Sequence, residues 1–304
     1  MLPRFRQGVS RGAGVIMLIA LPAAFSAAGC STASRTPSAS PAGSAAPGSS
    51  ARRAAPATPS ASAKPGVPAT PAARARPAAA QHPLAGKVIV LDPGHNGANW
   101  SHPATINRLV NIITGWKACD TTGTQTNAGY AEHAFNFNVA TRLARLLRAE
   151  GAKVILTRHN DNGVGPCITK RAAIGNRAHA DAAISIHADG GPPSGTGFEV
   201  ITPGLVPGHN DAIIGPSHRL ALDIRGAYQK ITHEPFSDYV GTRGLDTRTD
   251  LGGLNLSTVP KVFIECGNMR NPADAARLSD PGFRQRAAKA LAAGFTAFLT
   301  RHGN

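Results

Sequence analysis

The sequence predicts an α/β domain of three layers, with helices on both faces of a mainly parallel, twisted sheet. Two observations support this class. Short aliphatic runs without polar alternation recur after residue 84, as expected for strands that are covered on both faces. Helical patterns separate these runs, and strands that alternate with helices need crossover connections, which favour parallel pairing. The 220 residues that follow Leu84 are enough for one domain with its own core.

Each predicted strand is a short apolar run that ends at a turn or at a polar residue. Four runs fit this pattern, at residues 87–91, 153–157, 183–186 and 261–264, and a fifth strand is predicted at residues 198–201. One helix has a clear apolar face, formed by Phe135, Val139, Leu143, Leu146 and Leu147, and Gly151 marks its end. Further helices are predicted near residues 169–180, 217–232 and 281–300. The segment 242–260, rich in Gly, Asp and Thr, is predicted to be a loop.

The beginning of the chain has the pattern of an export signal, predicted over residues 1–30. Arginines at positions 4, 6 and 11 precede an apolar run at 15–29, which is too short to span a bilayer comfortably. The sequence Ala-Ala-Gly-Cys that ends at Cys30 resembles the lipobox of bacterial lipoproteins, although Ala27 stands where a larger aliphatic residue is usual. We therefore expect export to the cell envelope, periplasmic or extracellular. Membrane anchorage through a lipidated Cys30 and an uncleaved anchor remain open alternatives.

Residues 31–84 are predicted to form a disordered linker rich in Ala, Pro, Ser and Arg. This segment contains ten prolines and no aromatic residue, so it cannot bury enough apolar surface to offset its ordering entropy. Of the formal net charge of +15, nine positive charges lie in the first 84 residues, which hold no acidic residue. The basic character belongs mainly to this tail, which argues against nucleic acid as the partner of the ordered part.

Polar residues follow three of the predicted strands and could meet at one edge of the sheet. The first strand leads to Asp92 and His95, the third to His187, and the fourth to Glu265. Glu132 precedes the apolar helix face, and a crossover connection would bring this helix start to the same edge. Two imidazoles and one carboxylate form the ligand set of hydrolytic zinc sites, which keep one coordination position open. The H-E-x-x-H, G-x-S-x-G and P-loop motifs are absent from the sequence.

These residues resemble the successive motifs of a known enzyme family. The pieces are Asp-Pro-Gly-His-Asn-Gly at 92–97, Glu132 at a helix start, Ser-Ile-His-Ala at 185–188, and Glu-Cys-Gly at 265–267 followed by Asn271. Together they are similar to zinc-dependent N-acetylmuramoyl-L-alanine amidases of the Amidase_3 type. The resemblance extends from about Gly86 to Leu299, so the catalytic domain is predicted to occupy residues 85–304.

The resemblance implies both the reaction and the roles of the residues. His95, Glu132 and His187 are expected to bind Zn²⁺, and Glu265 is expected to be the catalytic carboxylate. The implied substrate is peptidoglycan or a muropeptide, cut at the amide between the lactyl group of N-acetylmuramic acid and L-alanine. We expect a monomer. Two alternatives remain: a metallohydrolase of another wall amide, or a wall-binding or regulatory protein without activity.

The cysteines and two other features complete the predictions. Cys119 and Cys167 lie in loop-like surroundings and are predicted to form a disulfide, whereas Cys266 is expected to be buried; the paired C-x-x-C spacing of a cysteine metal site is absent. Asp92 is expected either to orient His95 or to close the turn that precedes it. The apolar residues of the insertion, Trp100 to Trp116, are expected either to pack against the domain or to cover the cleft.

Overall fold

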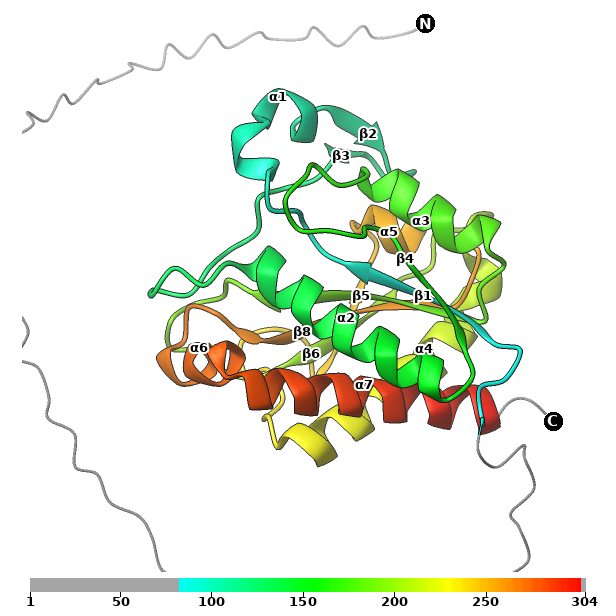
Figure 1. Ribbon diagram of the computed structural model, residues 1–304. Helices are drawn as coiled ribbons and strands as arrows, with labels where there is room; N and C mark the ends of the chain where they lie inside the picture. Colours follow the sequence, from blue (N-terminus) through cyan, green and yellow to red (C-terminus); the bar gives the residue numbers. More distant parts are fainter. Residues whose placement is uncertain (1–81, 302–304) are drawn as a thin grey trace, which may run out of the picture. The chain divides into compact units, whose positions relative to one another are not determined.

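The computed structural model describes residues 82–301, and its main sheet has six strands in the order β4-β1-β5-β8-β6-β7 (Figure 1). The strands are β1 (Val88–Pro93), β4 (Lys153–Leu156), β5 (Ala182–Asp189), β6 (Glu199–Pro203), β7 (Leu245–Arg248) and β8 (Lys261–Asn268). The four strands β4, β1, β5 and β8 are parallel to one another. β6 runs antiparallel to β8, and β7 pairs parallel with β6, so two reversed strands form one edge of a mainly parallel sheet.

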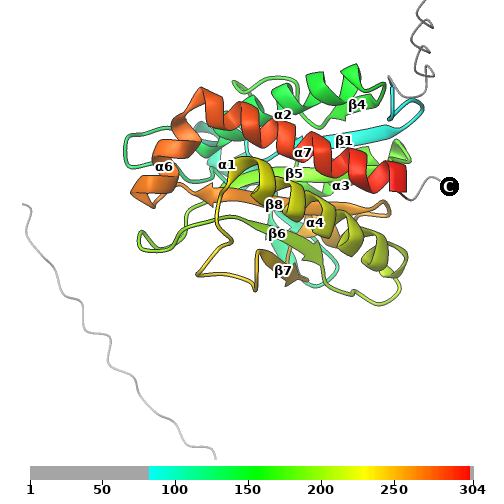
Figure 2. The same ribbon diagram turned by 90° about the horizontal axis from the view of Figure 1, so that it is seen from below.

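Helices cover both faces of the sheet, which confirms the predicted three-layer class (Figures 1 and 2). One face carries α2 (Glu132–Ala149), α4 (Asp211–Thr232) and α7 (Pro281–Arg301), and the other carries α3 (Ile168–Arg177) and α5 (Gly252–Asn255). α6 (Pro272–Ser279) follows β8. The insertion after β1 contains η2 (Asn99–Ser101), α1 (Pro103–Ile106) and a hairpin of β2 (Leu109–Asn111) and β3 (Trp116–Ala118).

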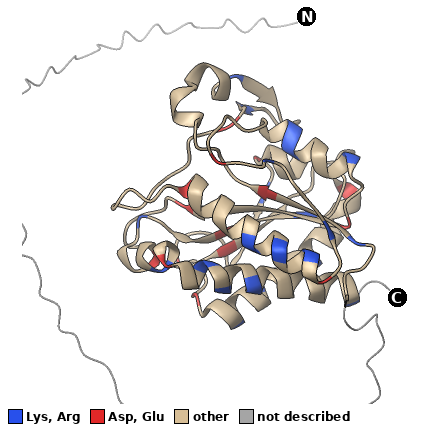
Figure 3. Cartoon of the chain, viewed as in Figure 1, with Lys and Arg blue, Asp and Glu red and all other residues tan. Residues whose placement is uncertain are grey.

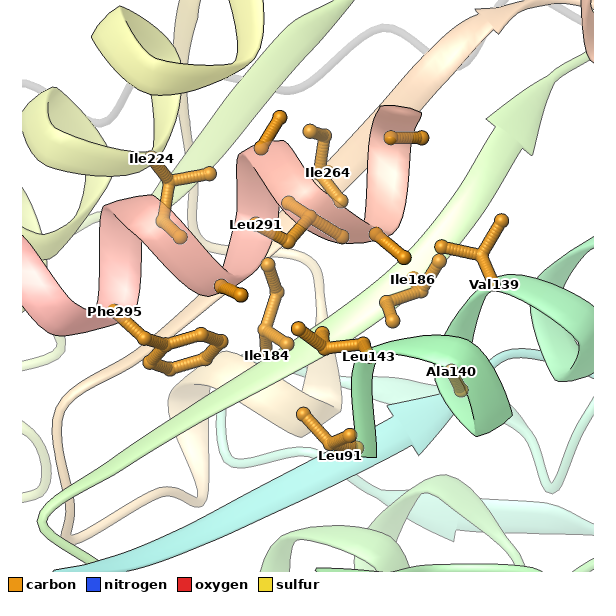
Figure 4. Close-up of a cluster of buried hydrophobic side chains, with 14 of the residues drawn as sticks. Leu91, Val139, Ala140, Leu143, Ile184, Ile186, Ile224, Ile264, Leu291 and Phe295 are labelled. Carbon is orange, nitrogen blue, oxygen red and sulfur yellow. The ribbon is translucent and has the colours of Figure 1, made fainter. Parts of the chain in front are cut away.

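The main hydrophobic core lies between the sheet and the layer of α2, α4 and α7 (Figure 4). Val139 and Leu143 of α2 lie in it with Ile184 and Ile186 of β5 and Leu291 of α7, and all five side chains are fully buried. The apolar face predicted for the first helix is thus the face that meets the sheet. A smaller cluster, which includes Val90, Ala180, Ala183 and Val259, packs under α3.

The structure differs from the predicted elements at three places. The prediction of a loop over residues 242–260 is wrong, because β7 and α5 lie within it. β7 is an edge strand with a single apolar residue, Leu245, and therefore lacks the apolar run of a covered strand. α4 begins six residues before the predicted start and runs through Pro216. The folded part also begins earlier than predicted, since Leu84 is fully buried in the core and its N–H donates to the carbonyl of Glu150.

The predictions for the beginning of the chain fall outside the described residues. These are the export signal over residues 1–30, the lipobox at Cys30 and all but the last residues of the linker 31–84. Within residues 82–301, none of the helices combines the length and the apolar character needed to cross a bilayer.

Candidate metal centre

Three neighbouring strands place functional side chains in one row across the sheet. His187 of β5 is in register with Glu265 of β8, and Glu265 is in register with Glu199 of β6. Side chains alternate between the two faces of a strand, so residues in register point to the same face. This is the face that carries α3 and α5, because the alternate positions Ile186, Ile264 and Val200 lie in the main core.

His95 and Glu132 reach the same place from outside the row. β1 ends at Pro93, and the next N–H, that of Gly94, donates to the carbonyl of Ile186, so His95 follows directly beside β5. Glu132 is the first residue of α2, as the sequence predicts. The predicted convergence of distant residues at the carboxyl edge of the sheet is therefore present.

His95, Glu132 and His187 form a compact cluster of metal-binding atoms. One ligand atom from each residue lies within 4.8 Å of the other two. Glu132 is central: its Oε2 is 3.1 Å from His95 Nε2, and its Oε1 is 2.9 Å from His187 Nδ1. The three side chains are only 12, 5 and 15 % exposed, respectively. Two imidazole nitrogens and a carboxylate at this spacing fit a zinc ion with an open position.

His95 and Glu132 of the cluster shift each other's pKa values. Burial disfavours the charged form of His95, but the facing carboxylates of Glu132 and Asp120 outweigh it and raise the pKa of His95 to about 10. Burial also opposes ionisation of Glu132, yet His95 and His187 hold the pKa of this carboxyl well below its usual value. A cation is therefore favoured beside Glu132, and a bound metal ion would replace the proton there.

Neighbouring residues fix the two imidazole rings. His95 Nδ1 donates to the carbonyl of Thr121 over 3.0 Å, which leaves Nε2 to face Glu132. The ring of His187 stacks on Phe263, with centroids 5.3 Å apart and an interplanar angle of 14°. On its other side lies Gly94, where an added Cβ would be 2.1 Å from the ring. The sequence therefore needs glycine at position 94 for a steric reason.

Glu265 lies beside the cluster without belonging to it. Its Oε2 is buried and has no hydrogen-bond partner among the described residues. Burial, reinforced by the negative charges of Glu132 and Glu199, raises the pKa of Glu265 well above its ordinary value. A raised pKa favours the protonated form of this carboxyl, as general acid–base work requires for the proton-donating step.

Glu199 is a second buried acid that the sequence analysis did not single out. It is 1 % exposed, and its Oε2 also lacks a partner among the described residues. Burial and the charges of Asp189 and Asp246 raise the pKa of Glu199 to about 8. The signal in the sequence was weak, because a lone acid inside a predicted strand does not show which residue it faces.

Asp92 has neither of the two roles that the sequence suggested. It accepts hydrogen bonds from Thr157, Ser185, Lys261 and Arg171 at 2.7–3.0 Å. Burial alone would raise the pKa of Asp92, but the two cations and two hydroxyls hold it far below its usual value. Asp92 therefore anchors a buried charge network under the site. Besides Glu132, which faces Nε2, the acid near His95 is Asp120, whose Oδ1 is 3.5 Å from His95 Nδ1.

The insertion divides into buried and exposed apolar residues. Ile106 and Ile112 are buried, which agrees with packing against the domain, whereas Trp100 and Trp116 are 76 and 65 % exposed.

The structure joins Cys119 to Cys167 in a disulfide, and Cys266 is a buried free cysteine. Basic residues are spread along several helices, and an acidic residue, Glu132, marks the start of α2 (Figure 3).

A cavity of about 260 Å³ opens beside the cluster. His95 and His187 form part of its wall, and its apolar side includes Phe263, Ile168 and Leu251. Lys117 and Asp250, whose charged groups are 3.2 Å apart, lie at the same cavity. The two histidines thus line a cavity that opens on the face of α3 and α5.

The chain is similar to known proteins in both sequence and structure. Residues 89–297 match the family model described as N-acetylmuramoyl-L-alanine amidase. The chain is 43 % identical over 221 residues to N-acetylmuramoyl-L-alanine amidase Rv3717 of Mycobacterium tuberculosis. The aligned region covers 72 % of this chain and 89 % of that protein. Two crystal structures of the N-acetylmuramyl-L-alanine amidase Ami1 are also similar. The one from Mycobacterium smegmatis has a TM-score of 0.68 at 42 % identity, covering 72 % of this chain and 99 % of that chain. The apo form from Mycobacterium abscessus has a TM-score of 0.67 at 43 % identity, and the match covers 71 % of this chain and 100 % of that chain. The chain therefore belongs to the N-acetylmuramoyl-L-alanine amidase family, Amidase_3.

Proposed function

We propose that the chain is a zinc-dependent peptidoglycan hydrolase in which His95, Glu132 and His187 hold the metal and Glu265 is the catalytic acid and base. Its activity as an N-acetylmuramoyl-L-alanine amidase follows from the family to which it belongs. The bond cut is the amide between the lactyl group of N-acetylmuramic acid and L-alanine. One observation carries the assignment of roles: a buried carboxyl with a free oxygen lies one strand away from a compact His-Glu-His cluster.

The metal supplies electrophilic chemistry: a bound Zn²⁺ polarises a carbonyl and makes water more acidic. Glu265 supplies the proton transfers. It takes a proton from the attacking water as the water oxygen bonds to the amide carbon, and it delivers that proton to the nitrogen as the C–N bond breaks. The first transfer needs the carboxylate form, and the raised pKa of Glu265 helps this carboxyl to keep the proton until the second transfer delivers it to the leaving amine. Glu132 and the two histidines fix the place where the scissile carbonyl must lie.

The experiment is product identification on a defined substrate. The full chain would be incubated with a purified muramyl peptide, and the products would be identified by mass spectrometry. We expect free N-acetylmuramic acid and a peptide with a free L-alanine amine, with about one zinc per chain by elemental analysis and loss of turnover after chelation. Cleavage at another amide would favour a different wall metallohydrolase, and metal binding without turnover would favour a non-catalytic wall-binding protein.

Membership of an amidase family that acts on peptidoglycan supports a location in or outside the cell envelope. We further propose that the chain is exported by the signal at residues 1–30, and that it works as a monomer. Mass spectrometry of the mature N-terminus would show whether cleavage precedes Cys30 and whether this cysteine carries a lipid. Light scattering of the purified chain would give the oligomeric state.

A further inference from the structure

The segment of residues 119–124 contacts two of the three proposed metal ligands. The carbonyl of Thr121 accepts from His95 Nδ1 at 3.0 Å, and the N–H of Thr124 donates to Glu132 Oε2 at 2.9 Å. Between them, Gly123 lies so close that an added Cβ would be 2.7 Å from both Glu132 Oε2 and His95 Cδ2. We call residues 119–124 the bracing segment.

His95 needs such support because its backbone is in the left-handed region, with φ of 57°. A residue other than glycine adopts this conformation only where its surroundings enforce it. Arg171 supplies part of this enforcement, since its Nη2 donates to the carbonyl of His95 at 3.0 Å. The same Nη2 donates to Asp120 Oδ2 at 3.0 Å, so one buried guanidinium connects the ligand residue to the bracing segment.

The bracing segment has little regular structure of its own and is fastened at its first residue. The disulfide joins Cys119 to Cys167, the residue directly before α3. The N–H of Ile168 donates to the carbonyl of Cys119 at 2.9 Å, and the N–H of Arg171 donates to the carbonyl of Cys167. The start of α3 therefore holds the bracing segment in two ways. One is the disulfide at Cys119, and the other is the guanidinium of Arg171, which contacts Asp120.

From this arrangement we propose that Asp120 is a positioning residue for His95, and that the Cys119–Cys167 disulfide sets the metal affinity by fixing the bracing segment. The inference rests on the proposed function, because it treats His95 as a metal ligand. Loss of a partner that orients a metal-binding histidine typically weakens metal binding 10- to 100-fold. Removing either Asp120 or the disulfide should do the same here, although neither contacts the metal itself.

The test is the zinc dissociation constant of the full chain, measured by competition with a chromophoric chelator. The variants are Asp120→Asn, which keeps the shape of the side chain, and the double variant Cys119→Ser/Cys167→Ser. Leu291→Ala is the matched control, because it destabilises the main core without touching the site. All measurements are made at a temperature where circular dichroism shows each chain folded.

We expect zinc binding about 10- to 100-fold weaker in both variants and unchanged in the control. Native affinity in a folded Asp120→Asn chain would overturn the role of Asp120, and native affinity in the folded double variant would overturn the role of the disulfide. If the double variant does not fold, the zinc affinity of Asp120→Asn decides whether the bracing segment positions His95, because this variant keeps the disulfide. Absence of zinc binding in the unaltered chain would instead contradict the proposed function.

Discussion

Gly94→Ala is the substitution that tests the geometry of the metal centre most directly. The φ angle of Gly94 lies outside the left-handed region, so the backbone accepts alanine there. The new methyl group would lie 2.1, 2.2 and 2.6 Å from three atoms of the His187 ring. Ordinary contact begins at 3.4 Å, so the ring would have to move by more than about 1 Å.

The ring of His187 has little room for such a movement, because Phe263 stacks against its other face. A displacement of about 1 Å at a catalytic site can lower the rate by about 10²-fold even without loss of a ligand. We therefore expect Gly94→Ala to lose most of its bound zinc and to lower hydrolysis of a muramyl peptide by at least about 10²-fold. The fold itself should persist, since the clash is confined to one ring.

The assays are zinc content by elemental analysis, turnover on the defined muramyl peptide, and the melting temperature. Gly226→Ala is the control, because this helical glycine in α4 has no atom within 4 Å of an added Cβ. It should keep native zinc content and turnover. Full zinc content and native turnover in a folded Gly94→Ala chain would refute the placement of His187 beside Gly94.

Three further predictions concern the acid, the disulfide and the effect of pH. Glu265→Gln should retain zinc, because Glu265 is not a ligand, and should lower kcat by about 10²- to 10⁴-fold; native kcat would remove Glu265 from the mechanism. Cys119→Ser/Cys167→Ser should lower the free energy of unfolding of the metal-free chain in urea by about 4 kcal/mol, from the entropy of a loop of 48 residues; an unchanged midpoint would contradict this. His95 contributes stability to the metal-free chain below pH 6.5, and this contribution is lost as the pH rises towards 10, because folding raises its pKa. Zinc must displace this proton, so the rise in melting temperature on adding zinc should grow from pH 6 to pH 9, and a constant rise would count against His95 as a ligand.

The sequence predicts those parts of the fold and site where the local pattern of apolar residues matches the burial of the same residues in the folded chain. His187 and Glu265 follow apolar runs, so their place at the sheet edge could be predicted before any contact was known. β7 could not be predicted, because an edge strand that pairs on one side needs no apolar run. Asp120 was missed because it lies in a segment without periodicity. Its position next to Cys119 was the available signal, since a predicted disulfide marks a loop that is held in place.

The reversed direction of β6 has a consequence for how the site can vary. His95 follows β1, and His187 and Glu265 lie in the carboxyl-terminal halves of β5 and β8, whereas Glu199 is the first residue of β6. The chain therefore enters the row of Glu199, Glu265 and His187 from the connection 190–198, and the sheet register keeps Glu199 opposite Glu265 whatever the length of this connection. Related enzymes could thus differ in length there without rebuilding the row.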